Sequence, residues 1–271
     1  MTDFRDLEAK GFVVIKKFLP DSLIELIRED YQRRYQQSSD YKNKNYHMLA
    51  SADWSFRPWI DPIIDVISKT TDLKINCIIP GTAYFNNQLM DFKWHQDHEC
   101  FYSWQDMYNA INCWIPIIKE DSQRSGIDIV PHDMLFEKYP DFFTDHIAGQ
   151  GAKKFFCDIS GFTDMRDDYH GNVQRLPFNL NDLSITPEVS VGDMLIIRQD
   201  VIHRTQDTID NRVAISIRCR NDKGILTRSH FLKSCPFKDT MITNRIEWYE
   251  RFKEKFEQTD QILIRDILES L

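Results

Sequence analysis

The clearest periodic pattern in the chain lies between residues 212 and 220, where hydrophobic and polar side chains alternate. Val213, Ile215, Ile217 and Cys219 share one parity, and the other parity holds Arg212, Ala214, Ser216, Arg218 and Arg220. A period of two predicts a β-strand, because successive side chains of a strand point to opposite faces. We expect one face to pack in a core and the arginine face to meet something polar.

The same analysis predicts the remaining elements. Strands are expected near residues 12–17, 75–80, 82–92, 107–118, 127–130, 194–198 and 212–220, and helices over 21–38, 61–70 and much of 240–271. Helices that precede a long series of strands are typical of an antiparallel double-sheet roll with helices braced against one side. We therefore expect a mostly β, α+β fold: a double-stranded β-helix (a cupin-like jelly roll) braced by N-terminal and C-terminal helices.

The length and composition favour one domain spanning residues 1–271. The chain has 271 residues, of which 42% are hydrophobic and 13% aromatic, enough for one substantial core. Residues 132–190 form a long stretch punctuated by Gly161, Gly171, Pro177 and Pro187. Long connections inside a compact domain are often lids, so we interpret this stretch as an insertion that covers a substrate, with a passive surface elaboration as the alternative.

Charge and hydropathy narrow the class of partner. The formal net charge of −8 argues against a nucleic-acid-binding protein, because such binding depends on Lys and Arg neutralising phosphates. No apolar stretch approaches the roughly 20 residues that a membrane-spanning helix needs, and the N-terminus lacks the pattern of a signal peptide. We expect a soluble cytoplasmic protein that acts on a small molecule and binds no membrane.

Trp94-His95-Gln96-Asp97 carries the strongest chemical signal. On an extended segment, His95 and Asp97 would point to the same side, so both could reach one ion. His203, which follows Gly192-Asp193 and an apolar run, could supply a third ligand from a distant strand. Two histidines and one carboxylate with open coordination positions are the arrangement associated with non-heme Fe(II) oxygenases.

The arginines of the 212–220 strand are candidates for binding a carboxylate. A planar guanidinium offers two parallel hydrogen bonds and stays charged at any working pH. Arg212, nine residues after His203, is the first choice, and the alternative is that all three arginines line a solvated strand face.

At this point the sequence resembles the phytanoyl-CoA dioxygenase family of Fe(II)/2-oxoglutarate oxygenases. The resemblance covers residues 9–220 approximately and rests on blocks in the same order: 11–20, 94–97, 111–117 with 125–131, and Gly192-Asp193 ahead of His203. It departs from the family at Pro131-His132-Asp133-Met134, where many relatives continue Pro-Gly-Ser-His.

The resemblance implies roles for individual residues. His95, Asp97 and His203 match the iron ligands, and Arg212 matches the arginine that binds the far carboxylate of 2-oxoglutarate. Arg218 is a rival for that role, because the spacing from the last histidine to the arginine varies in the family. Two further residues stand where the family places a hydroxyl and an indole near the co-substrate: Thr205 and Trp114.

The implied activity is hydroxylation of an aliphatic carbon with Fe(II), 2-oxoglutarate and dioxygen, releasing succinate and CO2. Related halogenases lack the carboxylate ligand, so Asp97 favours hydroxylation. Two alternatives stay open: a jelly-roll protein that binds a metal without turnover, and a cupin-type metalloenzyme that uses no keto acid.

The primary substrate is the least determined part of this interpretation. If Arg212 holds the keto acid, Arg218 could hold an acidic group of the substrate, and Phe101 could form part of a substrate wall. Nothing resembles a thioester-binding signature, which favours a small polar metabolite. The oligomeric state is left open.

Overall fold

The computed structural model describes residues 4–37, 57–88, 90–98, 105–168, 170–231 and 246–268. Its helices are α1 (Arg5–Lys10), α2 (Asp21–Gln37), α4 (Arg57–Thr70), α6 (His132–Lys138), α7 (Pro140–Phe142), the π-helix η2 (Phe143–Ile147), the 3-10 helix η3 (Leu180–Asp182), α9 (Ile246–Gln258) and α10 (Ile264–Leu268). Its strands are β1 (Phe12–Ile15), β2 (Cys77–Asn87), β3 (His95–Gln96), β4 (Ala110–Lys119), β5 (Ile127–Val130), β6 (Lys153–Cys157), β7 (Thr163–Asp167), β8 (Val173–Leu176), β9 (Met194–Arg198), β10 (Ile202–Thr205), β11 (Arg212–Arg220), β12 (Ile225–Thr227) and β13 (Gln261–Leu263).

The larger sheet is antiparallel, with the strand order β1-β9-β4-β11-β2. The expected strands at 127–130, 194–198 and 212–220 are confirmed with their bounds. The expectation of two strands at 75–80 and 82–92 is wrong, because β2 runs without interruption from Cys77 to Asn87. Its pairing with β11 absorbs an irregularity in register instead of breaking the strand.

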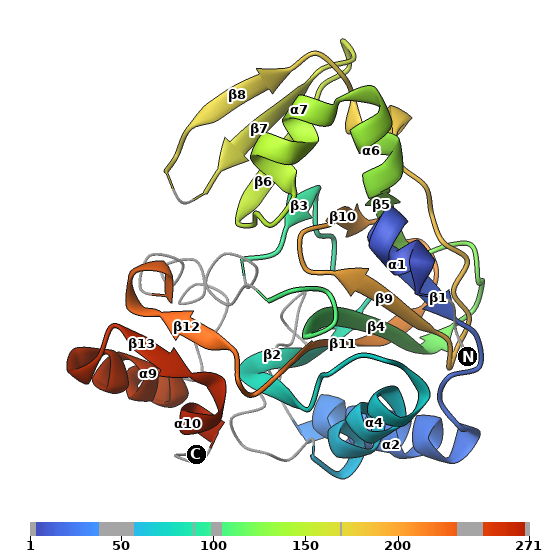
Figure 1. Cartoon of the computed structure of the whole chain (residues 1–271). Helices are drawn as coiled ribbons and strands as arrows, with labels where there is room; N and C mark the ends of the chain where they lie inside the picture. Colours follow the sequence, from blue (N-terminus) through green and yellow to red (C-terminus); the bar gives the residue numbers. More distant parts are fainter. Residues whose placement is uncertain are drawn as a thin grey trace.

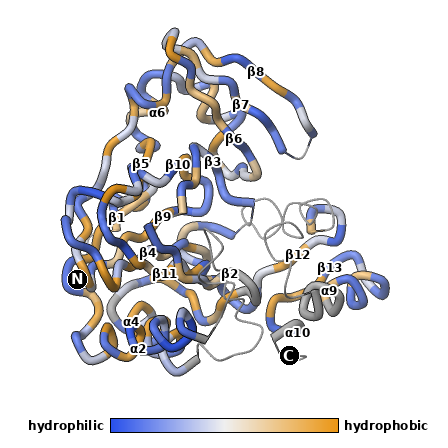
Figure 2. Tube along the Cα trace, turned by 180° about the vertical axis from the view of Figure 1, so that it is seen from behind, coloured by the Kyte–Doolittle hydropathy of each residue, from blue (hydrophilic) through white to orange (hydrophobic). Residues whose placement is uncertain are grey.

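Helices α2 and α4 cover the outer face of the larger sheet (Figure 1). The hydrophobic residues of β11, from Val213 to Cys219, pack there against Ile27 of α2 and Ile63 of α4. Figure 2 shows hydrophobic and hydrophilic residues alternating around both helices, as one buried face per helix requires. Burial of this face leaves the arginine face of β11 turned toward the second sheet.

The smaller sheet is also antiparallel, with the strand order β5-β10-β3-β6-β7-β8. A second hydrophobic cluster joins residues of both sheets, among them Trp114 of β4, Ile129 of β5 and Ala214 of β11. The two sheets therefore share an interior.

Residues 132–190 are far more regular than the sequence suggested. They form α6, α7, η2 and η3 together with β6, β7 and β8, which extend the smaller sheet beyond β3 (Figure 1). A third hydrophobic cluster, which includes Leu135, Phe155 and Met165, fills the space between the helices and this extension. Whether the segment acts as a lid over a substrate stays a prediction.

The described C-terminal residues contain the amphipathic helix α9, as expected, but also a strand. β13 pairs antiparallel with β12 in a separate two-stranded sheet. Within the described ranges, we find no helix that combines the length and the apolar character needed to cross a membrane.

Candidate metal centre

A pocket opens between the two sheets and collects most of the residues singled out in the sequence. The larger sheet contributes polar and aromatic side chains, and the smaller sheet contributes both predicted histidines. The lining includes Tyr84, Asn112, Trp114, Arg212, Ser216 and Arg218 on one side and His95, Asp97, Ile127, His203 and Thr205 on the other.

His95, Asp97 and His203 converge as predicted. Each offers a ligand atom, and these atoms all lie within 4.8 Å of one another. The convergence follows from strand pairing, because His203 of β10 is the direct cross-strand partner of His95 of β3. Asp97 follows β3, and its Oδ1 lies 3.4 Å from His95 Nε2 and 3.9 Å from His203 Nε2.

Backbone carbonyls fix both imidazole rings with Nε2 toward the centre. His95 Nδ1 lies 2.7 Å from the carbonyl oxygen of Lys93, and His203 Nδ1 lies 3.0 Å from that of Val201. A carbonyl can only accept, so each Nδ1 carries a proton, and Nε2 is the nitrogen of each ring that can bind a metal. A hydrogen bond of this kind orients a metal-binding histidine.

The two carboxylate oxygens of Asp97 have different neighbours. Oδ1 faces the histidines, while Oδ2 accepts hydrogen bonds from Asn112 Nδ2 at 2.7 Å and Arg218 Nη2 at 2.8 Å. Burial would raise the pKa of this carboxyl, but Arg218 and the two histidines hold it well below its usual range. Asp97 is therefore an ionised, oriented carboxylate.

The electrostatics also keep His203 neutral. Burial, reinforced by the neighbouring His95, lowers the pKa of His203 to about 4. A neutral imidazole is the form that ligates a metal. Two imidazoles and one carboxylate suit a divalent cation with an intermediate preference for nitrogen and oxygen.

Arg212 occupies the same interior as the three ligands but has different partners. It is 1% exposed, and its guanidinium donates to the carbonyl oxygens of Ser125, Asn87 and Met90 at 3.2, 2.7 and 3.2 Å. Among the described residues, no carboxylate forms an ion pair with it, and its Nε has no partner. Burial lowers its pKa to about 10.

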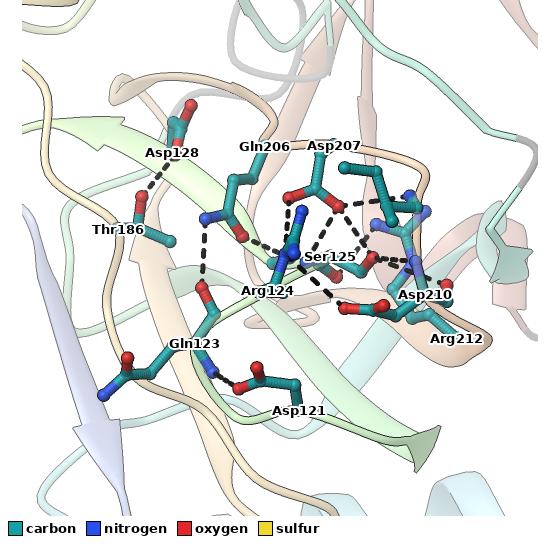
Figure 3. Close-up of polar contacts among 12 residues, drawn as sticks. Asp121, Gln123, Arg124, Ser125, Asp128, Thr186, Gln206, Asp207, Asp210 and Arg212 are labelled. Carbon is teal, nitrogen blue, oxygen red and sulfur yellow. Dashed lines mark hydrogen bonds and ion pairs between the residues drawn. The ribbon is translucent and has the colours of Figure 1, made fainter.

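The loop at Ser125 explains why Arg212 is held so firmly. Ser125 donates through its backbone N–H and its Oγ to Asp207, and the Asp210 N–H donates to Ser125 Oγ at 3.1 Å. Figure 3 shows this network beside the Arg212 side chain. The loop thus presents its carbonyl oxygen to the guanidinium in a fixed position.

Thr205 and Trp114 lie in the same pocket. The Thr205 hydroxyl accepts a hydrogen bond from the Phe92 N–H at 3.0 Å, which leaves its proton available to another acceptor. Trp114 Nε1 is buried without a partner among the described residues. An indole N–H in that state needs an acceptor, and a ligand in the pocket would supply one.

Arg218 lines the pocket, but other side chains of the protein already contact its guanidinium. Arg218 is engaged by Asp97 and by Tyr84, whose hydroxyl oxygen lies 2.8 Å from Arg218 Nη1. His98 points away from the triad, with Nε2 at 3.4 Å from Asp168 Oδ2. Phe101 falls outside the described residues.

Sequence reasoning missed Asn112 and Lys119, both on β4. Asn112 supports Asp97, and Lys119 lies with Nζ 5.5 Å from the centre of the Trp114 ring. The signal for Asn112 was a polar residue inside an apolar strand, at the same parity as Trp114. Burial and the adjacent Arg212 lower the pKa of Lys119 to about 8, a property that only the packed structure reveals.

Comparison with known proteins shows which solved structures share the fold, but it assigns the chain to no family. No protein-family model matches the chain, and no curated protein matches it. Among solved structures, the non-heme monooxygenase ThoJ in its apo form matches with a TM-score of 0.51 and 11% identity, over 81% of this chain and 77% of that chain. EctD from S. alaskensis, solved with 2-oxoglutarate and 5-hydroxyectoine, matches with a TM-score of 0.50 and 11% identity, over 82% of this chain and 76% of that chain. The chain shares the fold of these proteins.

Proposed function

We propose that the protein is an Fe(II)- and 2-oxoglutarate-dependent dioxygenase that hydroxylates an aliphatic carbon of a small molecule. Iron with the bound keto acid and dioxygen supplies the oxidation that turns a C–H bond into C–OH and releases succinate and CO2. His95, Asp97 and His203 hold the iron in this proposal, and the chain's other pocket residues place the keto acid.

One observation carries the proposal: a His-Asp-His triad and a buried arginine without a carboxylate partner share one pocket. The triad leaves coordination positions open, as a site for a chelating co-substrate requires. A buried guanidinium that no carboxylate contacts directly is costly, and an anionic ligand would offset that cost.

The pocket also fits the polar groups of a keto acid. Arg212 binds the far carboxylate, and two further donors line the same pocket: the Trp114 indole N–H from the larger sheet and the Thr205 hydroxyl from the smaller sheet. Asn112 and Arg218 hold Asp97 ionised and oriented, so we assign Arg218 to positioning Asp97. The carboxylate ligand itself favours hydroxylation over halogenation.

Two more specific features of the proposal, the arrangement of the sheets and the family, go beyond the similarity in fold. We propose that the two sheets form a double-stranded β-helix and that the chain is related to the phytanoyl-CoA dioxygenase family, on the sequence blocks described above. ThoJ is described as a non-heme monooxygenase, and EctD was solved with 2-oxoglutarate, so the likeness to both supports the general class. The cytoplasmic location and the preference for small molecules over nucleic acids or membranes remain predictions.

Anaerobic spectroscopy tests the proposal without knowledge of the substrate. Fe(II) and 2-oxoglutarate added together should give the visible absorption band of the chelated keto acid, and air should then release succinate slowly. A metal that binds without the band would indicate a cupin-type enzyme that uses no keto acid. A band without succinate under any condition would indicate a non-catalytic binding protein.

A further inference from the structure

The pocket has two ends, because β4 and β11 run antiparallel along one of its walls. Arg212 lies at one end, where the keto acid is proposed to bind, and Arg218 lies six positions further along β11. Asn112 of β4 is the direct cross-strand partner of Arg218 and also lines the pocket. Directly opposed residues of an antiparallel pair project to the same face of the sheet. Asn112 is therefore a polar group of the Arg218 end, which the proposed keto-acid anchor does not occupy.

The amide of Asn112 has a fixed orientation. Its Nδ2 donates a hydrogen bond to Asp97 Oδ2 at 2.7 Å, and an ionised carboxylate can only accept. Asp97 is ionised beside Arg218, whose Nη2 lies 2.8 Å from the same oxygen. The remaining polar atom of the Asn112 side chain is therefore Oδ1, an acceptor bonded to the same carbon as Nδ2 and so close to the metal centre.

The Oδ1 atom of Asn112 is buried and has no hydrogen-bond partner in the part of the chain that the structure describes. Asn112 is only 6% exposed, so bulk water cannot replace that partner. A buried acceptor without a donor is costly, and folded proteins contain few of them. A ligand that brings a donor to Oδ1 would remove this cost.

The keto acid is the wrong partner for this oxygen. Two carboxylates and a ketone make 2-oxoglutarate an acceptor of hydrogen bonds, and two acceptors without a proton between them repel each other. The buried donors of the pocket, Arg212 and the indole N–H of Trp114, suit the keto acid instead. Asn112 Oδ1 is thus left for a different molecule.

The neighbours of Asn112 favour a neutral donor attached to a hydrocarbon. Arg218 lies opposite Asn112 on one side, and a divalent cation at the triad would add further positive charge. Both charges disfavour an ammonium group at this position. Ile197 of β9 lies opposite Asn112 on the other side and lines the pocket, so it offers apolar contact to adjoining CH2 groups.

We propose that Asn112 Oδ1 accepts a hydrogen bond from a neutral O–H or N–H group of the primary substrate, an aliphatic alcohol or amide whose carbon chain contacts Ile197. This inference deepens the proposed function and rests on it for the division between keto acid and primary substrate. Because Asn112 contacts the metal ligand Asp97, the carbon that is oxidised lies within a few bonds of the anchoring group.

The test compares isomers that differ in the donor. Hexan-1-ol and 1-methoxypentane, pentanamide and N,N-dimethylpropanamide, and hexylammonium are titrated by ligand-observed NMR into the full-length chain with Zn(II) at the triad. Each isomer with an O–H or N–H group should bind at least about fivefold more tightly than its partner without one, and the better pair separates alcohol from amide. Hexylammonium should bind more weakly than hexan-1-ol. Equal affinity within both pairs, absence of binding, or tightest binding of hexylammonium would overturn the proposal.

Variants locate the acceptor. At saturating Zn(II), Asn112→Leu should abolish the preference for the donor, because leucine has a similar size and no acceptor. Asn86→Leu is the matched control and should retain the preference. Asn86 lines the same pocket and is 5% exposed, but its amide faces the hydroxyl of Ser216, which can both donate and accept. An equal loss in Asn86→Leu, or an unchanged preference in Asn112→Leu, would overturn the assignment.

A paramagnetic ion tests the distance from the metal centre and needs no variant. With Mn(II) in place of Zn(II), the protons on the carbon that carries the hydroxyl of hexan-1-ol should relax faster than the terminal methyl protons. The reverse order, or no enhancement, would place the hydroxyl away from Asp97 and overturn the proposal. If Asn112→Leu does not fold, this measurement and the isomer comparison still decide. All titrations omit 2-oxoglutarate, so a missing anaerobic absorption band would count against the keto-acid assignment alone.

Discussion

The buried arginines near the two ends of β11, Arg212 and Arg218, have different kinds of hydrogen-bond partner. Arg218 and Arg212 lie six positions apart on the same face, and both line the pocket. Arg218 meets a carboxylate of the chain, Asp97, whereas Arg212 meets only carbonyl oxygens. Breaking a buried ion pair is costly, so Arg218 and Asp97 form a structural unit that prepares a metal ligand. Arg212 has no carboxylate in direct contact among the described residues, although the charges of Asp207 and Asp91 act on it, and this supports its proposed role in binding an anion.

Arg220 shows that burial alone does not define this difference. It is also buried and donates to the carbonyl oxygens of Ile111 and Cys219. It lies beyond the residues that line the pocket. Arg212 is therefore distinguished by its place in the pocket together with its partners, and Arg220 offers a control for the effects of burial.

Removing Asp97 should have the largest effect, because it removes both a proposed metal ligand and the carboxylate partner of Arg218. Asp97→Ala deletes the anionic ligand and strands the Arg218 charge, so metal binding and succinate formation should both fall to background. Metal content and succinate release measure the result. Asp128→Asn is the control, since Asp128 is equally buried but pairs with Arg204. Full activity in Asp97→Ala would contradict the proposed centre.

Removing Arg212 should selectively weaken the binding of 2-oxoglutarate. Arg212→Ala should cost about 2 to 5 kcal/mol of 2-oxoglutarate binding, the range for truncating one side of a buried charge pair. Titration of the anaerobic absorption band gives the affinity, and metal binding should be nearly unchanged. Arg220→Ala should lower stability without this loss of affinity. An unchanged affinity in Arg212→Ala would return the role to Arg218.

Removing Arg218 should lower the affinity for the metal more than the affinity for 2-oxoglutarate. Arg218→Ala should lower metal affinity about 10- to 100-fold, the usual effect of deleting a partner of a metal ligand. At saturating metal, the affinity for 2-oxoglutarate should change little. Tyr84→Phe removes only the hydroxyl that contacts Arg218 and should give a smaller effect. A larger loss of keto-acid affinity than of metal affinity would reverse the two assignments.

The sequence could predict that His95, Asp97 and His203 converge, because strand parity and an ordered set of motifs both point to these residues. It could also predict the long strands of the larger sheet, whose hydrophobic patterns are strong. The two-residue strand β3 and the partly exposed strands β6 to β8 escaped, because they are too short or too polar to show a period. Their position depends on pairing with strands far away in the chain.

The sequence could not separate Arg212 from Arg218, because the two residues have the same parity on one strand. What separates them is the contact between Arg218 and Asp97, 121 positions apart in the chain. Contacts across sheets and registers between short strands are properties of the whole fold.

The smallest expected effect concerns Lys119, which adds a second cation at the Arg212 end. Burial and Arg212 lower its pKa to about 8, so it is protonated below that pH and neutral above it. A protonated Lys119 attracts the carboxylates of 2-oxoglutarate, and raising the pH through about 8 should raise the KM for the keto acid. We expect a change of about two- to fivefold, as for a charge several ångströms away in a partly screened interior. Lys119→Met should show the higher KM at every pH and lose this pH dependence, while metal affinity should stay constant across the same range. If the KM for 2-oxoglutarate still depends on pH in Lys119→Met, another group is responsible for the titration. The contrast between the two ends of β11 would then rest on Arg212 without Lys119.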